Sequence, residues 1–280
     1  MTTPLTMTPH APLYAYTGGR PFDPALPCIV FVHGALNDHS VWTLAARWFA
    51  HHGHGVLAID LPGHGRSAGP VLPDVESMAD AVLALLAKHQ VQRAALVGHS
   101  MGSLIALEAA SRATPGAISH LVMVGTAYPM RVSPALLELA ARTPLAAIDQ
   151  VVTFSHASMG AKPSYPGPGA WLHGASQALM RQVLARGEGI AGIEHNLFHH
   201  DFSACDRYAH GLGAAAQLRA ASSTRCSLVL GGRDRMTVPR QALAMAQALQ
   251  AEVHTLPKAG HALMQEDPDG LLAALRRALA

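Results

Sequence analysis

Short apolar segments alternate with longer amphipathic segments along most of this chain. Each apolar segment contains Val or Ile and is bounded mostly by Gly, Pro or Asp, as is typical of strands buried on both faces of a parallel sheet. The predicted strands are Cys28–Val32, Gly55–Ile59, Ala94–Val97, His120–Val124, Ser227–Gly231 and Ala251–Leu256.

The segments between these strands have a helical periodicity. The segment Asp74–Gln90 brings its apolar residues to one face and begins with Asp74 as a plausible N-cap. Two further helices are predicted at Pro239–Gln250 and Pro268–Leu279. Alternating strands and helices of this length predict an α/β fold, with a mostly parallel sheet flanked by helices.

The alternation stops near Tyr128 and resumes near Thr224. In between, Ser133-Pro134 and Thr143-Pro144 both match the start of a helix, with a capping residue followed by proline. The sequence therefore predicts an α/β core formed by residues 1–127 and 224–280. Residues 128–223 are predicted to be an inserted all-helical cap.

The segment "GHSMG" follows the third predicted strand and precedes a helical run. This G-x-S-x-G pattern matches a nucleophile elbow, in which Ser100 occupies a strained strand-to-helix turn between Gly98 and Gly102. A serine needs a base and an orienting carboxylate to act as a nucleophile. Asp234 and His261 each follow a predicted strand, so all three side chains are expected at one edge of the sheet.

These motifs, together with "FVHGALNDHSVW", "DLPGHGRS", "GGRDRMTVP" and "AGHALMQEDP", resemble the α/β-hydrolase superfamily, in its branch with a helical lid. The resemblance implies a catalytic triad of Ser100, Asp234 and His261. It also implies an oxyanion hole formed by the backbone N–H groups of Ala35 and Met101. Because the nucleophile is serine, relatives that need a carboxylate nucleophile, such as haloalkane dehalogenases and epoxide hydrolases, are disfavoured.

Several side chains have alternative interpretations. Asp201 and Asp206 compete with Asp234 as the acid, although neither follows a strand. Within "HNLFHHD" (His195–Asp201), two histidines four positions apart suggest a zinc site, but the pattern lacks the glutamate of HExxH and no metal is predicted. The glycines of "DLPGHGRS" lack the spacing and lysine of a phosphate-binding loop. Apolar residues of the cap are candidates for lining a substrate pocket: Trp171, Met130, Met159 and Phe198.

The composition excludes several classes of protein. A formal net charge of +2, with no run of Lys or Arg, argues against a nucleic-acid partner. The three cysteines have no CxxC spacing, which disfavours a disulfide framework. The N-terminal residues lack a signal-peptide pattern, and no segment of about 18 apolar residues predicts a membrane span. We therefore expect a soluble cytoplasmic protein, which could form a homodimer.

The predicted function is hydrolysis of a carboxylic ester, thioester or lactone by a serine nucleophile. The apolar cap favours a small to medium hydrophobic substrate, and the chemistry requires no cofactor. Two alternatives stay open. One is a C–C bond hydrolase of a diketone ring-fission product, or a related lyase. The other is a ligand receptor with vestigial hydrolysis.

Overall fold

The computed structural model of the chain describes residues 12–158, 171–221 and 223–280. Within these residues a seven-stranded sheet has the order β1-β3-β2-β4-β5-β6-β7. Its strands are β1 (Ala15–Tyr16), β2 (Cys28–Val32), β3 (Gly55–Ile59), β4 (Ala94–His99), β5 (Ile118–Val124), β6 (Arg225–Gly231) and β7 (Glu252–Leu256). Every pair is parallel except β1 with β3. The predicted mostly parallel sheet is confirmed.

The helices fall into two groups along the chain. Those before β6 are α1 (Thr43–Ala50), α2 (Val75–Lys88), α3 (Met101–Arg112), α4 (Pro134–Arg142), α5 (Pro144–Ser155), α6 (Leu172–Arg186), α7 (Leu197–Arg207) and α8 (Gly211–Ala221). Those after it are α9 (Leu243–Leu249), α10 (Leu263–Glu266) and α11 (Pro268–Ala278). Short 3₁₀ helices, η1 (His39–Trp42) and η2 (Pro239–Ala242), precede α1 and α9.

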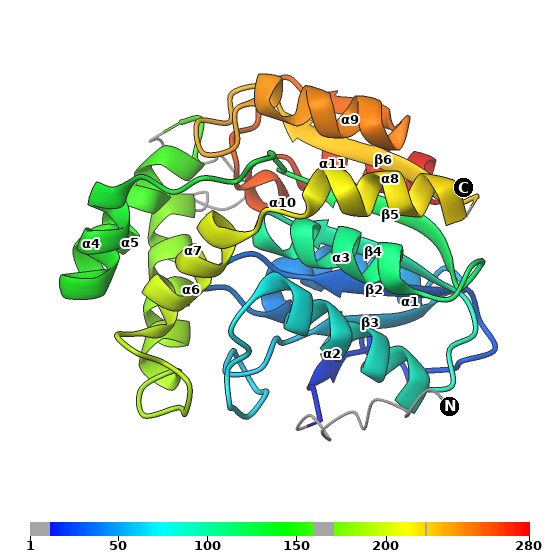
Figure 1. Cartoon of the computed structure of the whole chain (residues 1–280), viewed down its shortest axis with the longest axis horizontal. Coiled ribbons are helices and arrows are strands. Elements are labelled where there is room, and N and C mark those ends of the chain that lie inside the picture. The colour runs from blue at the N-terminus through cyan, green and yellow to red at the C-terminus, as the bar shows by residue number, and fades with distance from the viewer. Residues whose placement is uncertain (1–11, 159–170, 222) are drawn as a thin grey trace, which may run out of the picture.

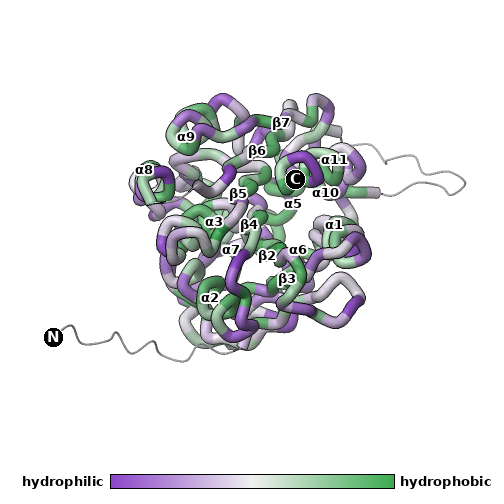
Figure 2. Tube along the Cα trace, turned by 90° about the vertical axis from the view of Figure 1, so that its right-hand side faces the viewer, coloured by the Kyte–Doolittle hydropathy of each residue, from purple (hydrophilic) through white to green (hydrophobic). Residues whose placement is uncertain are grey.

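The sheet separates two layers of helices, as Figures 1 and 2 show. Helices α2, α3, α8 and α9 cover one face, and α1 and α11 cover the other. The alternation of side chains along β2 explains this arrangement, since Val30 and Val32 face the first layer while Ile29 and Phe31 face the second. Both faces of the strand are buried, which accounts for its continuously apolar sequence.

Helix ends follow the capping residues in the sequence. Asp74 begins α2 by accepting a hydrogen bond from the Ser77 N–H, as predicted. Ser133 begins α4 in the same way by accepting from the Leu136 N–H, and Pro134 follows it. The capping pattern therefore indicated these starting points correctly.

Helices α4 to α8 all lie between β5 and β6 along the chain. Helices α4 to α7 project beyond the sheet, on the left of Figure 1, and share a hydrophobic core of their own. Leu36 and Val71, from loops of the sheet layer, pack into that core. Helix α8 instead packs on α3 and α9, beside the sheet.

Candidate active site

Ser100 lies between the end of β4 and the start of α3. Its backbone has φ 52° and ψ −121°, a strained conformation for a residue with a side chain. The two glycines of the motif permit this turn. A methyl group at Gly98 would collide with the Gly102 carbonyl, and one at Gly102 would collide with the Val32 carbonyl. The local sequence thus presents Ser100 at the carboxyl end of the sheet.

His261 and Asp234 form a buried pair at the ends of two neighbouring strands. The Nδ1 atom of His261 lies 2.8 Å from Oδ2 of Asp234. The other carboxylate oxygen, Oδ1, accepts hydrogen bonds from the N–H groups of Met236 and Thr237. Burial alone would raise the pKa of Asp234, but His261 and the hydrogen bonds from Thr237 outweigh it and lower the pKa. An ionised Asp234 therefore accepts a hydrogen bond from Nδ1 of His261, and Nε2 is the ring nitrogen that does not contact the carboxylate.

Ser100 and His261 line two adjoining cavities. The smaller, of about 70 Å³, lies under the inserted helices and is lined by apolar residues of α5, α6 and α7: Val151, Val152, Met180 and Phe202. The larger, of about 280 Å³, lies between the residues after β5 and those after β6. The structure thus brings the serine and the histidine to one concave site.

Two backbone N–H groups near Ser100 belong to Met101 and Ala35, the predicted oxyanion donors. Met101 is the first residue of α3, and Ala35 follows Gly34 in the loop after β2. Within the described part of the chain neither N–H donates a hydrogen bond to another group. Gly34 lies directly against the serine, because a methyl group placed on it would be 3.1 Å from the Ser100 Cβ atom. The predicted oxyanion donors are therefore near the predicted nucleophile.

The loop that carries Ala35 is held from two sides. His33 Nδ1 donates to the Gly34 carbonyl at 2.8 Å, and its Nε2 accepts from the Leu61 N–H at 3.1 Å. Burial, followed by the charge of His64, lowers the pKa of His33 to about 4, so the ring is neutral at pH 7. These bonds set the direction of the peptide between Gly34 and Ala35.

Asp201, on α7, holds the other side of this loop. It is completely buried, and its Oδ2 accepts from the Leu36 N–H and from His64 Nε2, each at 2.8 Å. Burial opposes both charges, but mutual attraction outweighs it and raises the pKa of His64 while lowering that of Asp201. Asp201, predicted only as a competitor for the triad acid, is instead bound to His64. Only the fold brings these two residues, 137 positions apart, together.

His99, beside the serine, does not face it as a base. Its Nε2 donates to the backbone carbonyl of His261 at 2.9 Å. Burial, and then the neighbouring His261, lower the pKa of His99 to about 3. A neutral His99 therefore supports the loop that carries His261.

The predicted pocket residues have different locations. Met130 lines the larger cavity. Trp171, immediately before α6, is 62% exposed and lines neither cavity at Ser100. Phe198 is buried in the core of the inserted helices. Met159 falls outside the described residues. Sequence periodicity could not separate a side chain that faces the site from one that faces the shared core of α4 to α7.

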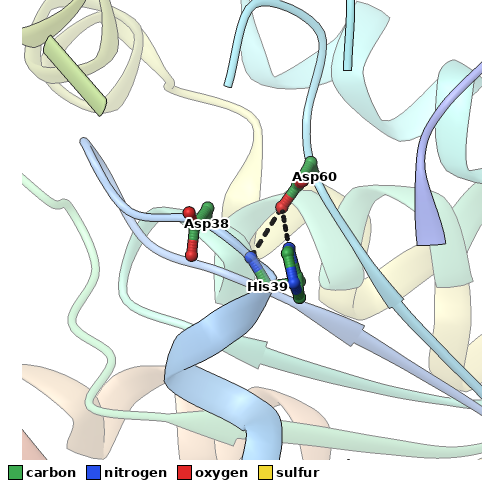
Figure 3. A group of neighbouring side chains, drawn as sticks. All are labelled: Asp38, His39 and Asp60. Carbon is green, nitrogen blue, oxygen red and sulfur yellow. Dashed lines mark hydrogen bonds and ion pairs between the residues drawn. The ribbon is translucent and has the colours of Figure 1, made fainter. Parts of the chain in front are cut away.

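Three side chains have atoms that could ligate a metal ion within 4.8 Å of one another: Asp38, His39 and Asp60. Figure 3 shows that Asp60 accepts from both the backbone N–H and the ring of His39. Its other oxygen accepts from the Arg66 N–H. Asp38 caps η1 by accepting from the Ser40 N–H. These hydrogen bonds account for the group as a structural tie between two loops.

The histidine-rich segment before Asp201 does not converge on one point. His195 and His199 contact each other edge to face, whereas His200 donates to the Leu72 carbonyl. The three cysteines, Cys28, Cys205 and Cys226, are buried and free, and burial raises the pKa of each thiol. Among the described residues, no helix is long and apolar enough to cross a membrane.

A mostly parallel sheet, with a strained serine at a strand-to-helix turn and a His–Asp pair beside it, defines the α/β-hydrolase class. The family model described as "Alpha/beta hydrolase family" matches residues 29–274. The chain belongs to this family. The predicted superfamily is thereby confirmed.

Known proteins similar to this chain have more than one activity. A 2-succinyl-6-hydroxy-2,4-cyclohexadiene-1-carboxylate synthase from Escherichia fergusonii is 27% identical over 259 residues, covering 91% of this chain and 95% of that protein. A structure of a thermophilic esterase has a TM-score of 0.69 at 25% identity, covering 90% and 88% of the two chains. The enol-lactonase from Burkholderia xenovorans has a TM-score of 0.72 at 21% identity, covering 95% and 96%, which shows the shared fold. The synthase and the esterase support an enzyme of the α/β-hydrolase class.

Proposed function

We propose that this protein is a serine hydrolase that cleaves a carboxylic ester, thioester or lactone through an acyl-enzyme. One observation carries the proposal: Ser100, in a strained turn, shares a cavity with His261, whose ring is bound to buried Asp234 at 2.8 Å. The similarity to a thermophilic esterase supports the same chemistry.

The proposed reaction has two steps. In the first, Ser100 Oγ attacks the acyl carbon while His261 Nε2 takes its proton and passes it to the leaving group. Asp234 keeps His261 in the required tautomer and stabilises the imidazolium. The N–H groups of Ala35 and Met101 donate to the oxyanion, an interaction worth several kcal/mol in related sites. In the second step His261 activates water, which releases the acid and regenerates the serine.

We also propose that residues 128–223 act as a cap on a core of residues 1–127 and 224–280. Residues of α5, α6 and α7 line the smaller cavity, which supports this role. The apolar lining favours a small to medium hydrophobic group there. A chain-length series of neutral 4-nitrophenyl esters tests the preference, and a kcat/KM that falls steadily from the acetate to longer acyl chains contradicts it.

Labelling with a fluorophosphonate probe tests the nucleophile. We expect the wild-type protein to be labelled with one equivalent and Ser100→Ala to remain unlabelled, with kcat lowered at least about 10⁴-fold. Ser103→Ala, which changes the next serine along the chain, in the first turn of α3, is the matched control and should retain labelling. Labelling that survives in Ser100→Ala refutes the assignment.

A second candidate is chemistry at a carbon–carbon bond, by hydrolysis of a diketone ring-fission product or by a lyase-type reaction. The similarity to the cyclohexadiene-carboxylate synthase favours it. In that case His261 and Ser100 would transfer protons at carbons next to a carbonyl. Turnover of a vinylogous diketone with no turnover of esters would select this candidate. A receptor, the third possibility, would release no more than about one product per site.

A further inference from the structure

Two arginines line the larger cavity beside Ser100. Arg131 lies in the segment between β5 and α4, and Arg235 directly follows Asp234 after β6. Both line the same cavity of about 280 Å³ as Ser100 and His261. Two guanidinium groups, which are charged at every physiological pH, therefore border the space next to the proposed nucleophile.

Neutral backbone acceptors hold both arginines in place. Nη1 of Arg131 donates to the Asp206 carbonyl at 2.6 Å. Nη2 of Arg235 donates to the carbonyls of Thr153 and His156 at 2.6 and 3.2 Å, and its guanidinium lies over the ring of Phe154. A guanidinium has five N–H donors, so each side chain is positioned while donors remain for a ligand.

The charge of the two arginines is not matched by carboxylates. Among the described residues, neither guanidinium has a carboxylate oxygen within 4.0 Å. Asp206 is near Arg131, but its Oδ1 accepts from the Val132 N–H instead. The residues lining the larger cavity include no Asp or Glu. A concave site with unmatched positive charge attracts an anion.

We propose that Arg131 and Arg235 bind a carboxylate carried by the substrate, with the rest of the substrate crossing Ser100. This inference rests on the proposed hydrolase function and adds the substrate class. The remaining lining of the larger cavity is largely apolar, including Met130, Leu136 and Phe154, which suits a short hydrocarbon chain ending in a carboxylate. The substrate is then an ester, thioester or lactone with an apolar end in the smaller cavity and an anionic end in the larger one.

Matched ester pairs test this inference. On the acyl side, the 4-nitrophenyl monoester of adipic acid is compared with 4-nitrophenyl hexanoate. On the alcohol side, 3-butyryloxybenzoate is compared with phenyl butyrate. We expect kcat/KM to favour the anionic member of at least one pair by tenfold or more, with the preference falling as salt rises from 0.05 to 0.5 M, since salt screens charges at an open cavity.

The decisive quantity is the ratio of kcat/KM for the anionic ester to that for the neutral ester. Arg131→Gln and Arg235→Gln should each lower it about tenfold, and Arg131→Lys should retain part of it. Arg240→Gln, an exposed arginine on η2 outside the cavity lining, is the control and should leave the ratio unchanged. Preference for the neutral member of both pairs, or a ratio that survives the double substitution, overturns the proposal.

Binding without turnover separates this inference from the proposed function. Calorimetric titration of Ser100→Ala protein with adipate should show saturable binding that is lost when both arginines are glutamine, in protein whose thermal unfolding matches that of Arg240→Gln. If no ester is cleaved and Ser100 is not labelled, the hydrolase proposal fails, yet adipate binding still decides the role of the arginines. Tighter binding of butyl phosphate than of pentanoate overturns the assignment to a carboxylate.

Discussion

At the scale of single residues, the site depends on pairs of groups in which one determines the protonation state of the other. The buried Asp234 carboxylate is fully engaged by His261, Thr237 and backbone N–H groups. Its lowered pKa keeps it ionised at neutral pH. His99 is also kept in one protonation state, because its lowered pKa leaves the ring neutral while Nε2 donates to the His261 carbonyl. The chemistry proposed for Ser100 thus requires a set of protonation states that the fold imposes.

Replacing Asp234 by asparagine tests this dependence. The uncharged amide would present either a donor or an acceptor to Nδ1 of His261. It would therefore no longer favour the tautomer in which Nδ1 carries the proton. We expect kcat for a 4-nitrophenyl ester to fall about 10³- to 10⁴-fold, with a smaller change in KM. Asp269→Asn, in the first turn of α11, is the control and should keep wild-type kcat. A loss of less than tenfold in Asp234→Asn would assign the acid elsewhere.

At the scale of elements, the Asp201 carboxylate ties α7 to the sheet layer. Asp201 reaches from this helix to the Leu36 N–H and to His64, and so joins the helix to the loop that carries Ala35 and to the loop that carries His64. Because Leu36 follows Ala35 directly, a shift of this tie would move the proposed oxyanion donor. We therefore expect α7 and the loop that carries Ala35 to move together.

The substitution Asp201→Asn leaves buried His64 without its counter-charge. We expect the free energy of unfolding to fall by roughly 3 kcal/mol, as for other broken buried pairs, and kcat to fall about tenfold with little change in KM. Asp149→Asn, which removes an exposed pair with Arg181, should change stability by less than about 0.5 kcal/mol.

A double-mutant cycle with His64→Asn measures the coupling in urea unfolding. His64 has a raised pKa, so its contribution is complete below its ordinary pKa and is lost as pH rises through the raised value. The coupling energy should therefore shrink at high pH. If the two substitutions have additive effects on stability at every pH, the ion pair between His64 and Asp201 does not connect α7 to the sheet layer.

At the scale of the whole molecule, buried neutral histidines make the fold sensitive to acid. His33 and His99 have pKa values lowered to about 4 and about 3, whereas both titrate near 6.5 in the unfolded chain. His33 faces His64, Asp60 and Asp201, and His99 faces His261 and Asp234. Between about pH 6.5 and 4 the unfolded chain binds protons that these two residues exclude when folded. The free energy of unfolding that these two neutral histidines contribute is therefore fully present above pH 6.5 and is lost as pH falls.

Urea unfolding at pH 6.5, 5.5 and 4.5 checks this expectation. Each of the two histidines should contribute up to about 1.4 kcal/mol per pH unit to the slope. His99→Gln, which can still donate to the His261 carbonyl, should reduce the slope by about that amount. The exposed His51→Gln serves as the control. An unchanged slope in His99→Gln would mean that His99 is protonated in the folded protein.

The sequence by itself determined the pattern of the six parallel strands, the helix caps and the nucleophile turn, because these depend on local periodicity, on side chains that bond nearby N–H groups, and on glycines where the backbone is crowded. It did not indicate β1, which at two residues is too short to show a periodicity. The order of Ser100, Asp234 and His261 at strand ends also placed them at one edge of the sheet. Only the tertiary structure decided which distant groups meet there. The pairing of Asp201 with His64 carries no local signal, and neither does the placement of Arg131 and Arg235 along one cavity, since both are set by the packing of the inserted helices on the sheet. The same packing left Trp171 exposed and brought Met130 to the cavity.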